Sequence, residues 1–188
     1  YQQVQGDQYA ALYSETVTVQ LENDFLPFLY PNQYVNFTPD SKASQLALSQ
    51  IDEDTVDVDA LQQIYDYVVS NLTYDYEKAD TVTTGYLPDV DETLKTGTGI
   101  CFDYAALTTA MLRSCDIPCK LQIGYAGDIK HAWIDVYIRS KGWVNQAVSF
   151  KGDTWTLMDP TFDSNSDDKE AIQDYIGDES NYTVQFTR

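Results

Sequence analysis

Apolar side chains at helical spacing dominate the first two thirds of the chain. Within residues 55–72 the apolar side chains are spaced alternately three and four residues apart. This spacing predicts an amphipathic helix with its apolar stripe at Val58, Leu61, Tyr65, Val68 and Leu72. A second helix is predicted from Cys101 to a point before Pro118, because proline cannot continue a helix. A short helix is expected over residues 41–49, and a polar loop is expected to follow the long helix through Leu87 and Pro88.

From residue 121 onward the apolar period changes to two, which is typical of strands. Residues 121–125 and 131–138 form two predicted strands joined by a turn at Gly127 and Asp128, the second with buried positions at Ala132, Ile134, Val136 and Ile138. Residues 143–148 and 155–159 would extend them as an antiparallel meander. A short helix over 169–176 and a last strand over 182–186 are expected near the end. The same alternation at Val17, Val19 and Leu21 predicts an early strand.

Helices first and a sheet later predict an α+β fold. The length of 188 residues suits a single globular unit. Within it we expect an N-terminal extension, residues 1–50, packed on a core domain of residues 51–188.

Charge narrows the classes of partner. The 11 basic and 30 acidic residues give a net charge of −19, and binding to nucleic acid is excluded as a main function because it needs clustered lysine and arginine. Anionic membrane surfaces would repel such a chain, and its apolar runs fall short of the roughly 20 residues that membrane insertion needs. The acidic run over residues 52–59 is read as the start of a helix, where carboxylates favour the macrodipole, with a metal site as the alternative.

Three cysteines are too few for a disulfide scaffold. Cys115 and Cys119 lie four residues apart and either pair or remain buried thiols. Cys101 follows the glycines of residues 97–99 at the predicted start of a helix. There the unpaired N–H groups and the helix dipole lower a thiol's pKa and can also stabilise an oxyanion, although Cys101 could equally be a small buried apolar residue.

His131 is the one histidine in the chain, so any mechanism that uses an imidazole base must use it. Asp159 ends a predicted strand before Pro160, and a carboxylate there could accept a hydrogen bond from the second imidazole nitrogen. As an isolated Asp-Pro pair it would indicate only a turn. Asp103 points away from Cys101 on a helix, and we expect it to stabilise the helix end and to pair with a base such as Arg113.

Together these segments resemble the transglutaminase-like superfamily. The resemblance rests on five blocks in the order Cys, His, Asp: Thr96-Gly-Thr-Gly-Ile-Cys-Phe-Asp-Tyr-Ala-Ala-Leu107, Met111-Leu-Arg-Ser-Cys-Asp-Ile-Pro118, Ile123-Gly-Tyr125, His131-Ala-Trp-Ile-Asp-Val136 and Trp155-Thr-Leu-Met-Asp-Pro-Thr161. Upstream, Leu72-Thr-Tyr-Asp75 looks like the segment that leads into the family's core. The resemblance covers approximately residues 57–162.

The resemblance implies a papain-like α+β core in which a cysteine-bearing helix packs on an antiparallel sheet. It implies Cys101 as nucleophile, His131 as base and Asp159 as the residue that orients the base. Tyr74, in the upstream segment, is a candidate oxyanion donor alongside the backbone N–H of Cys101, with aromatic packing as the alternative. Trp133, Gly99 and Tyr104 are candidates for lining a substrate groove, Trp133 because it shares a strand face with His131.

The implied chemistry is attack of a thiolate on an amide carbonyl through a thioester. We expect a protease or amidase that acts on a protein or peptide substrate, because nothing in the sequence marks an amine-acceptor site. A cross-linking transglutaminase is the alternative enzyme, and a peptide or cell-surface polymer binding module is the alternative without turnover. Peptide N-glycanases are argued against by the missing Cys-x-x-Cys pairs, and arylamine acetyltransferases by the segment Asp159-Pro-Thr-Phe162.

No cofactor is expected. The acidic loop over residues 163–170 resembles the start of a calcium loop, but Asp168 replaces its turn glycine and Asp174 its final glutamate, so a solvated loop is the preferred interpretation. Acidity, few cysteines and a first residue other than Met favour an extracellular or surface-attached bacterial protein, which we expect to be a monomer.

Overall fold

A computed structural model describes residues 2–5, 8–10, 12–52, 54–144, 148–151, 154–157 and 181–188 of the chain. The helices in this part of the chain are η1 (Leu26–Phe28), α1 (Lys42–Gln50), α2 (Asp57–Asn71), α3 (Tyr76–Thr81), α4 (Val90–Thr96) and α5 (Cys101–Ser114). The strands are β1 (Gln2–Gln5), β2 (Gln8–Ala10), β3 (Thr73–Tyr74), β4 (Thr98–Gly99), β5 (Cys119–Ala126), β6 (Ile129–Ile138), β7 (Gly142–Val144), β8 (Val148–Lys151), β9 (Thr154–Leu157) and β10 (Tyr182–Thr187).

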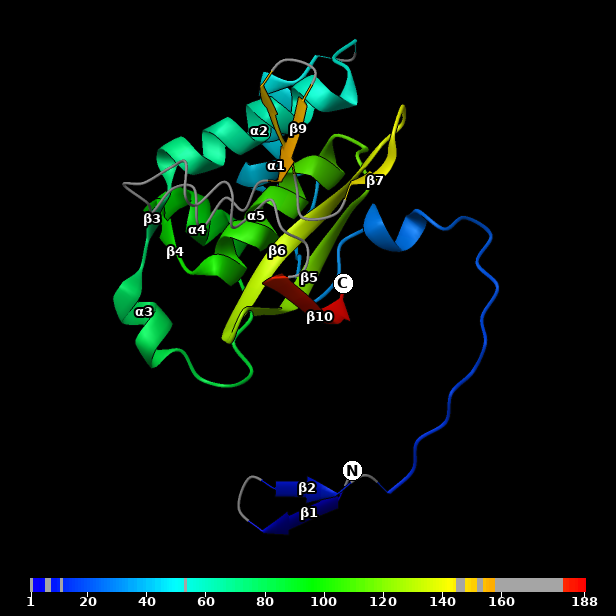
Figure 1. The fold of residues 1–188 in the computed structure, drawn as a ribbon. Helices are drawn as coiled ribbons and strands as arrows, with labels where there is room; N and C mark the ends of the chain where they lie inside the picture. The colour runs from blue at the N-terminus through cyan, green and yellow to red at the C-terminus, as the bar shows by residue number, and fades with distance from the viewer. Residues whose placement is uncertain are drawn as a thin grey trace.

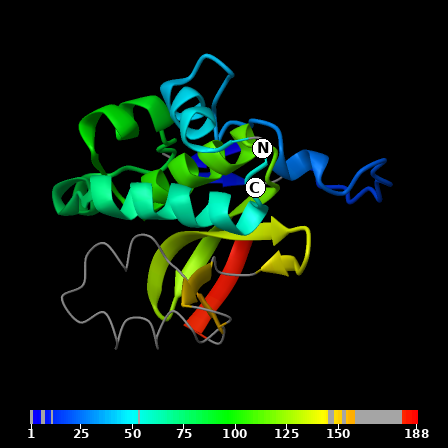
Figure 2. The same ribbon diagram turned by 90° about the horizontal axis from the view of Figure 1, so that it is seen from above.

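The main sheet has the strand order β10-β5-β6-β7, with every neighbouring pair antiparallel. The helices gather on one side of it (Figures 1 and 2), so the α+β class is confirmed. The predicted strands over 121–125 and 131–138 are present in β5 and β6, and the turn between them has Gly127 in the left-handed region at φ 59°. The predicted last strand is present as β10, which pairs with β5.

The meander ends sooner than expected. β7 pairs with β6, but β8 and β9 form a two-stranded sheet of their own within the described residues. The edge beside β5 is taken by β10, which arrives from the far end of the sequence. Strand periodicity predicts that a segment is extended but not which strand it pairs with, so the order of strands was wrong after β7. The predicted helix over 169–176 lies outside the described residues.

α5 is the central helix, and its environment explains its composition. Every residue from Asp103 to Arg113 is buried, because α5 packs on β5 and β6 on one side and on α1, α2 and α4 on others. A helix that is covered all round needs apolar or small side chains in every direction, which is why its sequence shows only a weak stripe. The sheet contributes the alternating side chains of β6 predicted to be buried, Ala132, Ile134, Val136 and Ile138.

The helices predicted over 41–49 and 55–72 are present as α1 and α2. Val35, Phe37, Ala43 and Ala47 are buried in the same core cluster as α5, so residues well before 51 contribute to the main core. The division of the chain at residue 50 remains a prediction.

Two short helices replace the predicted polar loop. α3 begins after Asp75, whose side chain accepts a hydrogen bond from the Lys78 N–H at 2.8 Å. α4 begins after Asp89, which caps it in the same way, and ends at Gly97 with φ 65°. Helices of six and seven residues are too short to display an apolar stripe, and only their capping residues could have indicated them.

The early strand predicted at Val17, Val19 and Leu21 is wrong. These side chains are 69%, 68% and 48% exposed, and residues 13–21 have no regular structure. Figure 1 shows this segment running outside the body of helices and sheet. A strand needs a neighbour for its backbone hydrogen bonds, and in the described part of the chain none pairs with this segment. None of the helices described is long and apolar enough to cross a membrane.

Candidate active site

Cys101 is the first residue of α5, as predicted, and its side chain is half-buried. The approach to it is fixed by the short parallel pairing of β3 with β4, in which Tyr74 lies opposite Gly99. The Thr73 N–H donates to the Gly97 carbonyl and the Asp75 N–H to the Gly99 carbonyl, both at 2.9 Å. The backbone just before the thiol is therefore held by a second segment of the chain.

Asp103 closes the start of α5. Its Oδ2 accepts a hydrogen bond from the Ile100 N–H at 2.8 Å, while the N–H groups of Asp103 and Tyr104 donate to the Ile100 carbonyl. The expected role in stabilising the helix end is confirmed. Gly99 is required beneath it, since a Cβ at that position would lie 2.6 Å from the Asp103 Cβ.

The expected partner of Asp103 is wrong. The carboxylate lies 2.7 Å from the Lys78 Nζ and also accepts a hydrogen bond from the Tyr86 hydroxyl, and Lys78 donates to that hydroxyl at 2.6 Å. Arg113 lies ten residues further along α5, about 15 Å away, so its side chain forms its hydrogen bonds at the other end of the helix. Lys78 and Tyr86 carried no signal in the sequence, because each is far from Asp103 along the chain.

His131 lies in β6, opposite Gly124 of β5, and is only 5% exposed. Its ring stacks against Trp133 with centroids 6.2 Å apart and planes 15° from parallel, so the two share a strand face as the alternation predicts. Trp133 in turn meets the ring of Tyr182 in β10 at 5.1 Å. The imidazole therefore belongs to an aromatic layer on the sheet face opposite the α5 core.

Along the axis of this unit the backbone of His131 lies toward the same end as Cys101, while its side chain is on the sheet face turned away from the α5 core. The Arg113 side chain donates to the Cys119 carbonyl, so the end of α5 lies beside the start of β5. From there the helix extends about 20 Å back to Cys101, and β5 extends about 17 Å to Gly124, the partner of His131. Figure 1 shows α5 and β6 side by side along this direction.

The other candidates have the following places. Tyr74 is half-buried, with its ring 5.0 Å from that of Tyr76 and 6.5 Å from that of Tyr104. Tyr104 is fully buried and Trp133 is 1% exposed. Their roles at an oxyanion or a substrate groove, like that of the buried Gly99, remain predictions. Asp159 and the acidic loop over 163–170 lie outside the described residues.

Burial and hydrogen bonding shift the pKa values around Asp103. Burial and the hydrogen bond to Asp103 raise the pKa of Tyr86 to about 12. For Lys78, burial acts to lower the pKa, but the hydrogen bonds with Asp103 and Tyr86 outweigh it and the pKa is raised. Lys78 is therefore a cation and Tyr86 a neutral donor at neutral pH.

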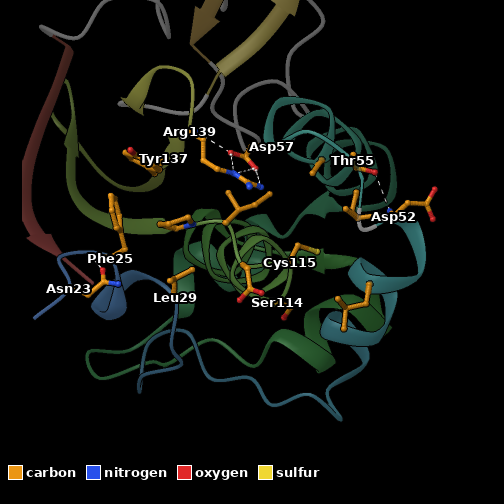
Figure 3. Close-up of a pocket in the computed structure, with 16 residues that line it drawn as sticks. Asn23, Phe25, Leu29, Asp52, Thr55, Asp57, Ser114, Cys115, Tyr137 and Arg139 are labelled. Carbon is orange, nitrogen blue, oxygen red and sulfur yellow. Dashed lines mark hydrogen bonds and ion pairs between the residues drawn. The ribbon is translucent and has the colours of Figure 1, made fainter.

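A cavity of about 710 Å³ lies at the opposite end of α5 (Figure 3). Asp57 and Arg139 form an ion pair at its wall with Oδ1 and Nη2 2.6 Å apart, and the Cys115 thiol also lines it. Asp57 begins α2, so the predicted helix start is confirmed for the acidic run. Within the described part of the chain, no group of three or more acidic, cysteine or histidine side chains could hold a metal.

The two other thiols differ from Cys101 in their surroundings. Cys119 is fully buried with its sulfur 3.5 Å from the Thr109 Oγ1, and burial raises its pKa to about 12. Burial raises the pKa of Cys115 to about 11. Each of the three cysteines is a free thiol in this structure.

Comparison with known proteins connects this geometry to a family. Residues 44–160 match the model of the transglutaminase-like superfamily. A protein described as a "Putative Cysteine Protease" from Cytophaga hutchinsonii superposes with a TM-score of 0.57 at 23% identity, over 89% of this chain and 48% of that one. The periplasmic domain of TgpA from Pseudomonas aeruginosa superposes with a TM-score of 0.52 at 18% identity, over 76% of this chain and 49% of that one.

A curated relative, UPF0252 protein MJ1282 from Methanocaldococcus jannaschii, is 36% identical over 62 residues, which are 30% of this chain and 18% of that protein. The chain therefore spans less than a fifth of this relative and about half of each structural neighbour.

Proposed function

The chain belongs to the transglutaminase-like superfamily, and from this premise we propose that it is a cysteine-dependent enzyme that hydrolyses peptide or side-chain amide bonds. Cys101 is the proposed nucleophile, His131 the base and Asp159 the residue that orients the imidazole. The substrate is a protein or a peptide.

The observation that carries the proposal is the position of Cys101. A half-buried thiol as the first residue of a buried helix lies beside the N–H groups of the first turn and the positive end of the helix dipole, where negative charge is favoured. The single histidine lies 30 residues further along the chain, within the segment that matches the family.

In the first step His131 takes the proton of the Cys101 thiol, the sulfur bonds to the carbonyl carbon of the amide, and the carbonyl electron pair moves to oxygen. The tetrahedral intermediate then breaks its C–N bond, with the proton on His131 going to the leaving amine. This leaves a thioester. A water molecule gives a proton to His131 and attacks the thioester. The C–S bond breaks, His131 gives the proton to the sulfur, and a carboxylic acid and the thiol are released.

The oxyanion needs donors close to the sulfur. Because the N–H groups of Asp103 and Tyr104 are engaged with the Ile100 carbonyl, the first-turn donors proposed for it are the N–H groups of Cys101 and Phe102. Tyr74 is the proposed side-chain donor, since the β3–β4 pairing sets it opposite Gly99, two residues before the nucleophile.

The test is a panel of amide substrates incubated with the wild type, Cys101→Ala and Cys115→Ala. Cys115→Ala is the matched control, because it removes a half-buried thiol at the other end of the same helix. We expect cleavage of a peptide, or release of ammonia from a glutamine-containing peptide, by the wild type and the control, with a loss of at least about 1,000-fold in Cys101→Ala.

A labelled primary amine in the same reaction separates the possible acyl acceptors. Incorporation of the amine in preference to hydrolysis would replace the hydrolase by a cross-linking transferase. Turnover by Cys101→Ala equal to that of the wild type would refute the proposed nucleophile. Peptide binding without turnover by any variant would identify a binding module.

A further inference from the structure

The buried charge cluster beside Cys101 has no place in the acyl-transfer steps, yet it touches the backbone that presents the nucleophile. We propose that Lys78, Tyr86 and Asp103 are positioning residues for Cys101, which lock the turn before α5 and neutralise the buried carboxylate two residues from the sulfur. This inference rests on the proposed function, because it concerns the reactivity of the proposed nucleophile.

Asp103 receives hydrogen bonds from several parts of the chain. Its side chain is fully buried, and its two oxygens receive donors from three separate segments: the Ile100 N–H at 2.8 Å, the Lys78 Nζ at 2.7 Å and the Tyr86 hydroxyl. A buried carboxylate that only capped its own helix would need one or two N–H groups. A cation and a phenol brought from elsewhere in the chain indicate a charge that must be held in one place and balanced.

Hydrogen bonds and packing join this cluster to the backbone just before Cys101. Asp103 Oδ2 binds the N–H of Ile100, the residue directly before Cys101, and the Asp103 side chain fills the space above Gly99. Gly99 also accepts a hydrogen bond from the Asp75 N–H, and Asp75 caps α3, the helix that carries Lys78. The loop before the nucleophile is thus fixed from both sides, by β3 and α3 and by the first turn of α5 (Figure 1).

The charge of Lys78 balances the charge of Asp103. An unpaired carboxylate in the first turn of the helix that begins with Cys101 would oppose formation of the thiolate, because like charges disfavour ionisation. Lys78 removes this penalty by pairing with the carboxylate at 2.7 Å, and the Lys78 side chain is 30% exposed, so the pair lies at the edge of the core. Among the described residues, the other titratable groups on β3, α3, α4 and the first turn of α5, with the α3 cap Asp75, are Tyr74, Asp75, Tyr76, Glu77, Asp80, Asp91, Glu92, Lys95 and Tyr104, and the proposed base His131 lies on β6.

The test measures the pH dependence of Cys101 alkylation by iodoacetamide in the folded protein, which needs no substrate. Trypsin cleaves after Lys95, Arg113 and Lys120, so Cys101 lies in a different peptide from the other two cysteines and its labelling is read separately by mass spectrometry. We expect Lys78→Met to move the midpoint upward by about one unit. Lys78→Arg keeps the charge and should restore most of the wild-type midpoint.

The matched control is Lys95→Met, which removes a lysine from an exposed ion pair with Glu92 at 2.8 Å and changes the net charge equally. It should leave the midpoint at the wild-type value. The double variant Lys78→Met with Asp103→Asn removes both charges, and we expect its midpoint to return toward the wild type although the pair is gone. If Lys78 had only a structural role, the alkylation midpoint of the double variant would lie further from the wild-type value than that of Lys78→Met.

Tyr86→Phe supports the same test if Lys78→Met does not fold. It keeps the ring that packs on Phe102 and removes the hydroxyl that binds Asp103, and an upward shift of the midpoint is expected here too. Equal midpoints for the wild type, Lys78→Met and Tyr86→Phe would overturn the positioning role. A wild-type Cys101 that titrates like a free thiol, near pH 8.5, would instead overturn the proposed nucleophile.

Discussion

Arg113 holds three distant parts of the chain together, and its replacement by methionine should destabilise the protein strongly. The guanidinium is 2% exposed and donates to three backbone carbonyls, those of Tyr30 at 2.7 Å, Cys119 at 2.8 and 3.0 Å, and Arg188 at 3.0 Å. These belong to the segment before α1, to the start of β5 and to the residue that follows β10. A single side chain therefore ties the N-terminal segment and both strands to the end of α5.

The magnitude follows from those contacts. Hydrogen bonds to a charged group contribute about 1.5–3 kcal/mol each, but the cost of burying the guanidinium offsets part of the four bonds. Methionine fills the space of the aliphatic stem but removes the donor from all three carbonyls, of which that of Arg188 keeps a hydrogen bond from the Leu121 N–H. We expect a loss of about 3 kcal/mol in the free energy of unfolding. The loss of unfolding free energy in Arg113→Lys should lie between zero and that of Arg113→Met, because one ammonium cannot reach three carbonyls as the fork of arginine does.

Unfolding in urea, followed by tryptophan fluorescence, measures the effect. With a slope of about 2 kcal/mol/M the midpoint should fall by about 1.5 M, at an unchanged slope. Arg139→Met is the matched comparison, because it is the same chemical change at a side chain that is 80% exposed. A loss in Arg113→Met no larger than that in Arg139→Met would refute the reasoning.

Three further outcomes are expected. Gly124→Ala should cost about 3 kcal/mol and speed amide exchange in β10, because the new Cβ would lie 2.0 Å from the Thr183 carbonyl oxygen; unchanged exchange there would contradict this. The hydrogen bond from Arg139 lowers the pKa of Asp57, so this carboxylate stabilises the fold above its ordinary pKa and loses that effect as pH falls through its lowered pKa. Asp57→Asn should therefore be less stable than the wild type near pH 7. The difference between their urea midpoints should shrink in acid. Cys119, with its pKa raised to about 12 by burial, should resist iodoacetamide at pH 7.5 until urea unfolds the protein, and fast native labelling in mass spectrometry would show that the core opens there.

Much of the fold could be predicted because the spacing of apolar residues depends on whether a segment is a helix or a strand. The period of two over β5 and β6 and the period of three and four over α2 reflect which side chains each element must bury. α3 and α4 were missed because six and seven residues do not complete enough turns to show a period. Residues 17–21 alternate like a strand and still form none, since pairing needs a neighbour that a local pattern cannot provide.

The same distinction applies to the candidate site. The place of Cys101 at a helix start followed from nearby glycines and the helical stretch after it, and the shared face of His131 and Trp133 followed from their spacing of two. The partner of Asp103 could not be found in this way. Lys78 reaches it only because β3 pairs with β4 and Asp75 then starts α3 at that point, which is a consequence of tertiary structure.

On the proposed function, the first turn of α5 sets the reactivity of Cys101 and its last turn sets the stability of the fold. The helix is buried from Asp103 to Arg113, so it cannot shift along its axis without losing its packing, and a thiol on its first turn keeps its relation to the N–H groups there. If Arg113 acts only on folding, Arg113→Met should lower the urea midpoint and leave the pH midpoint of Cys101 alkylation unchanged in the folded protein. Lys78→Met should show the larger change in the alkylation midpoint. A change in the thiol midpoint on loss of Arg113 would mean that the packing of α5 transmits strain along its whole length, and the two ends could no longer be treated as independent.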